Sequence, residues 1–179
     1  MPENNLPDAL RDQIDRSRVA LALATASGDM PLVRVNAGFS SLTGYAPSDA
    51  LDRNCRFLQG PETPADQVRA MSRFLRDDAA DDGCFPVLNY TLDGRRFLNL
   101  VFMTKLRDGD GRLRFVLASQ FDTSASDART ALAENDAALG RNMQDLRRAA
   151  GQFGLIMSDS TALIARSIST LARISFRDE

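Results

Sequence analysis

Apolar residues recur every four positions near the start of the chain, at Leu6, Leu10 and Ile14, and then give way to short apolar runs. The four-residue spacing predicts a short amphipathic helix. The run 19–25, the turn sequence SGDMP and the run 32–35 together predict a β-hairpin. The chain therefore begins with a helix that leads into two paired strands.

Helical and strand patterns follow one another in the middle of the chain. Several short helical segments are expected between residues 36 and 76, and the acidic sequence DDAADDG after them predicts a solvated loop. Beyond it, turn sequences at Asp93-Gly94 and DGDG separate three predicted strands, 85–92, 95–106 and 112–121. DGDG lacks the further ligands and the closing glutamate of an EF-hand loop, so we interpret it as a hairpin turn and not as a calcium site.

The last part of the chain has the pattern of helices that are apolar on one side only. One stripe comprises Leu132, Leu139, Met143, Leu146, Ala150 and Phe153. Glycines at 151 and 154 predict a break, and a second helix is expected from about residue 158. We therefore divide the chain into an N-terminal helical cap (1–18), a core (19–123) and a C-terminal extension of two helices (124–179) with a break near 151–157.

These elements define the fold class. Two strands, four small helices and three strands predict an α+β domain with a five-stranded antiparallel sheet and helices on one face. The N-terminal helix and the C-terminal helical extension are additions to it. The order of the elements resembles that of a PAS domain.

Composition excludes several kinds of chemistry. The 179 residues include no histidine and two cysteines, so a Ser-His-Asp triad, a histidine-ligated metal and the phosphoacceptor of a histidine kinase cannot be built from this chain. The net charge of −2 argues against nucleic acid as the main partner. Neither a membrane-spanning run nor a signal peptide is recognisable, which predicts a cytoplasmic protein with reduced thiols.

One motif is specific. Residues 54–60 read NCRFLQG and resemble the flavin-binding loop of the LOV family, the blue-light-sensing branch of PAS domains. The resemblance covers about residues 19–123. FSSLTGY precedes the cysteine, LNYTLDGRRFLN follows it with Asn89 and Asn99 ten residues apart, and Gln120 comes twenty-one residues after Asn99.

The resemblance implies a cofactor and a reaction. FMN is expected to bind non-covalently, and blue light to form a reversible bond between the Cys55 sulfur and the flavin C4a carbon. Gln120 is expected to relay protonation of the flavin N5 atom to the helical extensions or to a dimer interface. The excited flavin takes the part that an imidazole base has in thiol enzymes, so the missing histidine is no obstacle.

The expected cofactor-binding residues come from the motif and from strand alternation. Alternation groups Asn89, Asn99 and Gln120 with apolar side chains on one face of the sheet, where buried amides need a partner such as the flavin. The full set is Thr25, Asn54, Arg56, Leu58, Gln59, Arg69, Arg73, Asn89, Asn99, Val101, Met103, Val116, Ala118 and Gln120. No metal ligand is predicted.

The phosphate site departs from the family pattern. Arg56 offers a forked cation for the FMN phosphate, but the second arginine of the family, seventeen residues after the cysteine, is Ser72 here. Arg69 is the favoured substitute and Arg73 the other. Both could equally be solvated helix charges. We therefore expect a weaker phosphate clamp than in the family.

The opposite face of the predicted sheet is also apolar, which requires a cover. Its members are Tyr90, Leu92, Leu98, Leu100, Phe102, Leu106, Phe115, Leu117 and Phe121. The terminal helices or a second copy of the chain are expected to cover them. Light would then change helix packing or association, so we predict a homodimer and leave open an unknown protein partner at the C-terminal helices.

Two other functions remain open at this point. A flavin PAS module could sense redox state without using the thiol, and a purely structural module would bind no cofactor. In either case we expect a sensor or an interaction domain and not an enzyme. Cys84 is expected to be a small buried hydrophobic residue.

Overall fold

A single antiparallel sheet forms the centre of the molecule. The computed structural model describes residues 6–124, 128–151 and 156–157. Within these residues, five strands lie in the order β2-β1-β5-β4-β3, and a short sixth strand pairs with β4. The strands are β1 (Ala20–Thr25), β2 (Leu32–Val35), β3 (Asp82–Tyr90), β4 (Arg96–Arg107), β5 (Leu113–Asp122) and β6 (Ile156–Met157). The predicted five-stranded α+β fold is confirmed, whereas β6 was not predicted.

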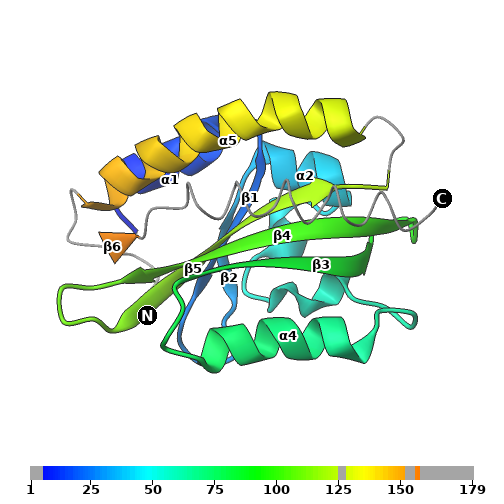
Figure 1. Cartoon of the computed structure of the whole chain (residues 1–179), viewed down its shortest axis with the longest axis horizontal. Helices are drawn as coiled ribbons and strands as arrows, with labels where there is room; N and C mark the ends of the chain where they lie inside the picture. The colour runs from blue at the N-terminus through cyan, green and yellow to red at the C-terminus, as the bar shows by residue number, and fades with distance from the viewer. Residues whose placement is uncertain (1–5, 125–127, 152–155, 158–179) are drawn as a thin grey trace.

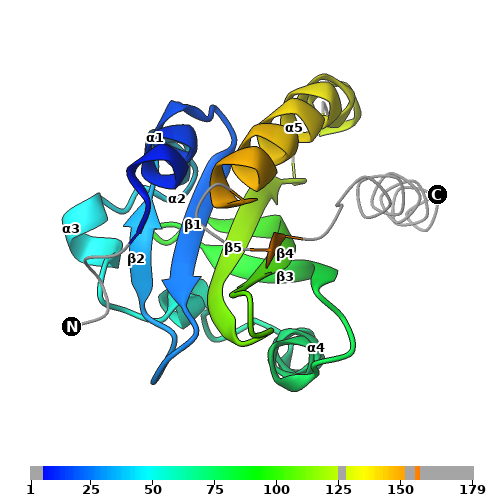
Figure 2. The same ribbon diagram turned by 90° about the vertical axis from the view of Figure 1, so that its left-hand side faces the viewer.

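Helices lie on both faces of this sheet (Figures 1 and 2). The terminal helices α1 (Asp8–Arg16) and α5 (Ala128–Gly151) lie side by side across one face. The other face carries α2 (Ala37–Thr43), α3 (Pro47–Ala50), the 3₁₀ helix η2 (Cys55–Leu58) and α4 (Ala65–Arg76). The second C-terminal helix, predicted from about residue 158, lies outside the described residues.

The apolar outer face is covered by the terminal helices, as predicted. Buried residues of α1 and α5 pack on the sheet in one cluster, which includes Leu10, Ile14, Met143, Leu146, Ala150, Leu100, Phe102, Leu106, Leu117 and Phe121. Phe102 and Phe121 meet edge to face at 5.6 Å between ring centroids. The Asn142 side chain donates to the Ser17 hydroxyl at 3.0 Å and joins α5 to the end of α1. The burial of apolar area on this face therefore fixes both helices to the sheet.

Two residues expected on the outer face lie elsewhere. Strand β3 ends at Tyr90, so Leu92 falls in the turn and remains 56% exposed. The hydroxyl of Tyr90 accepts from the Glu62 backbone N–H at 3.2 Å, on the loop that follows η2. The prediction that these two side chains lie under the helical cover was wrong, because β3 is an edge strand and its end is open to solvent.

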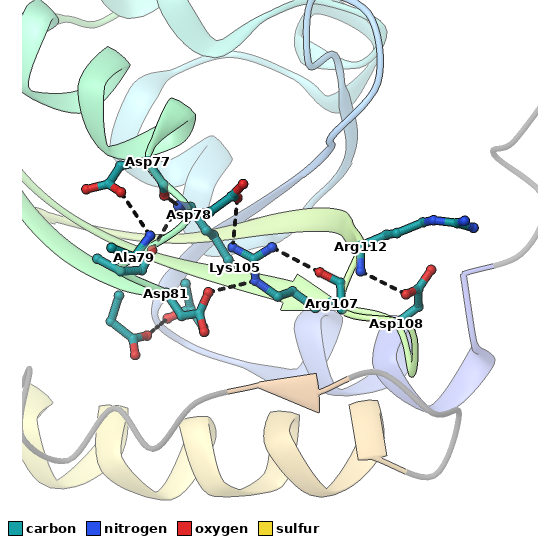
Figure 3. A network of polar contacts seen from close by, with 12 residues as sticks. Asp77, Asp78, Ala79, Asp81, Lys105, Arg107, Asp108 and Arg112 are labelled. Atoms are coloured by element: carbon teal, nitrogen blue, oxygen red, sulfur yellow. Dashed lines mark hydrogen bonds and ion pairs between the residues drawn. The ribbon is translucent and has the colours of Figure 1, made fainter.

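A buried lysine organises the acidic sequence between α4 and β3 (Figure 3). Lys105 is 1% exposed, and its ammonium group donates to the carbonyls of Asp77 and Ala80 and lies 4.4 Å from the centroid of the Phe74 ring. Arg107 Nε donates to the Asp81 carboxylate at 2.8 Å. The predicted solvated loop is confirmed for residues 77–80, which are exposed, and its carbonyls also solvate a buried cation.

Lys105→Met should lower the free energy of unfolding by about 1–3 kcal/mol, because two carbonyls lose their charged donor while the apolar stem is kept. Chemical denaturation monitored by circular dichroism measures this. The matched control is Arg112→Met, since the Arg112 side chain is exposed, and we expect a change within about 0.5 kcal/mol there. Equal changes in the two variants would contradict the role given to the ammonium group.

Candidate functional site

A cavity of about 200 Å³ lies between the inner face of the sheet, η2 and α4. Alternation directs every second side chain of the strands into it. The photoactive candidate Cys55 and most of the predicted cofactor-binding residues line this cavity: Asn54, Arg56, Leu58, Gln59, Asn89, Asn99, Val101, Met103, Val116, Ala118 and Gln120. The structure thus brings the cysteine motif and the strand amides to one site.

Three predicted residues do not line the cavity. Thr25 lies on the opposite side of β1 from Ala24, and its hydroxyl bonds to Ser27 in the hairpin turn at 3.0 Å. Arg69 and Arg73 are exposed on α4. Nine lining residues were not in the predicted set: Ala22, Ala24, Met30, Leu32, Val68, Met71, Ser72, Leu75 and Val87. The helical spacing of Val68, Met71, Ser72 and Leu75 was the available signal for the α4 wall.

A chain of three amides crosses the sheet at the cavity. Asn99 Nδ2 donates to Asn89 Oδ1 and to Gln120 Oε1, both at 2.9 Å. All three side chains are buried, and they come from the neighbouring strands β3, β4 and β5. Asn99 uses both of its amide hydrogens on these two neighbours. The neighbouring amides of Asn89 and Gln120 therefore both turn their oxygens toward Asn99.

The amide chain leaves one buried acceptor unused. Asn99 Oδ1 is buried and has no hydrogen-bond partner among the described residues, in a residue that is 0% exposed. An unpaired buried carbonyl costs about 1–3 kcal/mol. The residue also lines the cavity, so a bound group that carries an N–H donor would satisfy it. The pyrimidine edge of a flavin has such a donor, and the residues present therefore fit this group.

Local packing holds Cys55 at the start of η2. The Asn54 side chain accepts from the Arg56 N–H at 2.9 Å and caps the short helix. Phe57 is clamped between the Tyr45 ring, at 4.8 Å between centroids, and the Arg53 guanidinium, 4.4 Å from its centroid. The cysteine is thereby held on a rigid element and not on a free loop.

The thiol of Cys55 is protonated at neutral pH. Burial raises its pKa to about 12, although a hydrogen bond with the Gln120 side chain partly opposes this. Nucleophilic thiols of enzymes have the opposite shift, because a neighbouring positive charge or helix N-terminus stabilises the thiolate. A protonated thiol needs a base at the site before its sulfur can act as a nucleophile.

The segment after the cysteine is fixed to the edge of β3. A Cβ on Gly60 would lie 2.3 Å from the Tyr90 ring, so only glycine allows this approach. The Thr63 hydroxyl donates to the Leu88 carbonyl at 2.7 Å and accepts from the Gly60 N–H at 3.0 Å. Gln67 accepts from the Leu88 N–H at 2.9 Å. These contacts satisfy the open edge of β3 and tie the motif to the sheet.

Arg56 carries the positive charge at the cavity. Its guanidinium makes two hydrogen bonds of 2.6 Å to the Asp29 carboxylate. This ion pair raises the pKa of Arg56 and lowers that of Asp29. Both side chains are exposed, so the pair lies at the solvent-facing side of the site.

Comparison with known proteins gives relatives that include phototropins and blue-light-activated histidine kinases. A family model described as a PAS domain matches residues 19–125. Phototropin-2 of Oryza sativa subsp. japonica is 34% identical over 119 residues, which are 64% of this chain and 13% of that protein. Blue-light-activated histidine kinase 1 of Erythrobacter litoralis is 34% identical over 154 residues, 84% of this chain and 41% of that protein. The chain therefore spans less than half the length of either relative.

Solved structures agree with this result. The Rhodobacter sphaeroides LOV protein has a TM-score of 0.78 and 28% identity, over 95% of this chain and 96% of that chain. The light-state dimer of the fungal blue-light photoreceptor Vivid has a TM-score of 0.55 and 25% identity, over 59% of this chain and 78% of that chain. In the described parts of the chain, no helix combines the length and apolar composition needed to cross a membrane.

Proposed function

The chain belongs to the PAS domain family, in its LOV branch, and on this premise we propose that it is a blue-light photoreceptor that binds FMN non-covalently. One observation carries the proposal. Cys55 and the buried amide chain of Asn89, Asn99 and Gln120 face the same cavity, and Asn99 Oδ1 lacks a partner there. The LOV relatives indicate a blue-light photoreceptor domain.

Different side chains would bind different parts of the cofactor. Asn89 and Asn99 would bind the polar edge of the ring, because their amides offer both donors and acceptors. Apolar residues such as Val101 and Met103 from the sheet and Met71 and Leu75 from α4 would pack on its faces. Arg56 would bind the phosphate. Such a mixture of apolar walls and few convergent polar groups is typical of cofactor sites.

The proposed reaction uses the proton that Cys55 retains. A bound flavin supplies blue-light absorption and, once excited, an electrophilic C4a carbon and a basic N5 atom. The Cys55 sulfur would bond to that carbon and its proton would pass to the basic nitrogen, so atoms and charge would balance without an added base. In the dark the bond would break and the proton would return to the sulfur. The raised pKa of Cys55 suits this cycle, because the thiol stays unreactive until light arrives.

Gln120 is suited to transmit the change. Its amide lies near Cys55 and accepts from Asn99, and it stands on β5 between Ser119 and Phe121, which face the opposite side of the sheet. Phe121 packs in the cluster with α1 and α5. A proton gained at the cofactor would reverse the hydrogen bond that Gln120 makes there. The altered strand would then change how the terminal helices pack.

Gln120→Leu should therefore separate photochemistry from output. The variant should still bind flavin and form the thiol bond in blue light, because Cys55 is untouched. The light-induced change in hydrogen exchange of α1 and α5 should fall to less than half of that in the natural protein. Hydrogen exchange read by mass spectrometry in dark and light measures this.

The matched control is Gln59→Leu, which removes a cavity amide that lies outside β5. It should keep the light response of the helices. An undiminished response in Gln120→Leu, or an equal loss in both variants, would contradict the relay.

Association is the second part of the proposed output. Vivid forms a light-state dimer, and we propose that this chain is likewise a homodimer whose association or arrangement changes with light. The α1 and α5 helices are the elements that connect the sheet to such an interface. Light-scattering masses and hydrogen exchange, each compared in dark and light, test this. Identical results in both states would contradict the proposal.

A further inference from the structure

Arg56, the cation proposed to bind the phosphate, is already paired with a carboxylate. Arg56 makes two hydrogen bonds of 2.6 Å to the carboxylate of Asp29, twenty-seven residues earlier in the chain. This fork-to-fork geometry is the arrangement in which arginine also binds a phosphate. Asp29 therefore uses the same donors that a flavin phosphate would need.

Asp29 is held in this place by its backbone. Asn54 Nδ2 donates to the Asp29 carbonyl at 2.5 Å. The next residue, Met30, lines the cavity and has a positive φ of 54°. The turn between β1 and β2 is thus tied to the capping residue of η2. The carboxylate would remain near the cavity even when its hydrogen bonds to Arg56 are broken.

Nothing else at the cavity replaces the charge that Asp29 neutralises. Arg56 is the one charged side chain among the residues that line the cavity, all of which the structure describes. Ser72 lines the wall of α4 and is neutral, whereas Arg69 and Arg73 are exposed and absent from the lining. A phosphate entering here meets a neutral ion pair and not a net positive site.

We propose that Asp29 is a specificity-determining residue of the flavin site: by holding Arg56, it limits the preference for FMN over riboflavin to a small factor. This inference rests on the flavin binding proposed above. The phosphate of FMN must displace the Asp29 carboxylate from Arg56. The displaced carboxylate then stays nearby and repels the phosphate, because both are negatively charged. Riboflavin has the same ring and ribityl chain without the phosphate, so it bears neither cost.

The expected change in FMN affinity is small because the ion pair is exposed to solvent. Both partners are more than half exposed, with side-chain accessibilities of 58% for Arg56 and 66% for Asp29. Exposed ion pairs are weak because water screens them, so removing one changes affinity by about five-fold or less. Asp29→Asn and Asp29→Ala should therefore strengthen FMN binding about five-fold and leave riboflavin binding unchanged.

The test measures dissociation constants of FMN and riboflavin for the flavin-free full chain, by the quenching of flavin fluorescence. The natural protein should bind the two flavins within about three-fold of each other, and the Asp29 variants should prefer FMN by an additional factor of about five. Asp110→Asn, which removes an exposed carboxylate from the turn between β4 and β5, is the charge-matched control and should leave the ratio unchanged.

A double variant identifies the partner. In an Arg56→Gln background, Asp29→Asn should no longer change the ratio of the two constants. An unchanged ratio in both Asp29 variants, or an equal change in Asp110→Asn, would overturn the inference while flavin binding itself stands. A change that persists without Arg56 would overturn it as well. Failure of the natural protein to bind either flavin would overturn the proposed function together with the inference.

Discussion

Cys55→Ala should leave the protein yellow and abolish the thiol bond formed in blue light. The flavin should stay bound because the amide chain and the apolar walls of the cavity do not involve the sulfur. Alanine has no atom that can bond to the ring, so the loss should be complete. Absorption spectra taken before illumination, after it and after dark recovery, without added reductant, measure the effect.

The second cysteine of the chain is the matched control. Cys84 lies on β3 and packs against the cluster on the outer face of the sheet. Cys84→Ala should bind flavin and bleach reversibly as the natural protein does. A thiol bond that survives Cys55→Ala, or one that disappears in Cys84→Ala, would contradict the assignment of the photoactive thiol.

Asn99→Leu should cause the largest loss of stability among the cavity variants. Leucine removes the two donors to Asn89 and Gln120 and leaves buried carbonyl oxygens without partners. An unsatisfied buried polar group costs about 1–3 kcal/mol; the substitution creates two of them and removes the unpaired Asn99 Oδ1, so we expect unfolding to become easier by about 1–3 kcal/mol. Flavin affinity should fall at least ten-fold, because the ring also loses the Asn99 carbonyl. Denaturation of the flavin-free chain and flavin titration separate the two effects.

Asn142→Leu provides the comparison. Asn142 lies on α5 and donates to the Ser17 hydroxyl at the end of α1, away from the cavity lining. The same substitution there should cost about 1 kcal/mol and leave flavin affinity unchanged. If Asn99→Leu were no more harmful than Asn142→Leu, the amide chain would not be the organising element of the site.

Alternation made the strand part of the site predictable. Every second residue of an extended strand faces the same side, so Asn99, Val101 and Met103 follow from one another once a single one is assigned to the cavity. The same rule explains the error at Thr25. Ala24 lines the cavity, and the neighbouring residue must therefore face away from it. The error was one of register and not of fold.

The cavity-facing residues of α4 were not predicted from the sequence. The cavity face of this helix is formed by Val68, Met71, Ser72 and Leu75, which share one stripe. Arg69 follows Val68 by one residue, about 100° around the helix, and so lies on the exposed side. Arg69 is favoured for the phosphate because it lies three residues before Ser72, a spacing that predicts the same helical face, and that role remains a prediction.

Contacts between distant segments were beyond reach of the sequence. The Arg56–Asp29 pair and the Lys105 contacts join residues that are more than twenty positions apart. Neither follows from local propensity, because each depends on how two loops approach in the folded chain. The Asp29 carboxylate neutralises Arg56, and loop carbonyls solvate Lys105. Composition alone counts each of these cations as an ordinary surface charge.

The absorption spectrum of the natural full chain, recorded before blue light, directly after it and again after recovery in the dark, tests the central claim most directly. The account predicts a yellow protein whose flavin absorption is bleached by blue light and returns in the dark over repeated cycles. A protein that stays colourless after addition of FMN, or a yellow one whose spectrum blue light leaves unchanged, would contradict it.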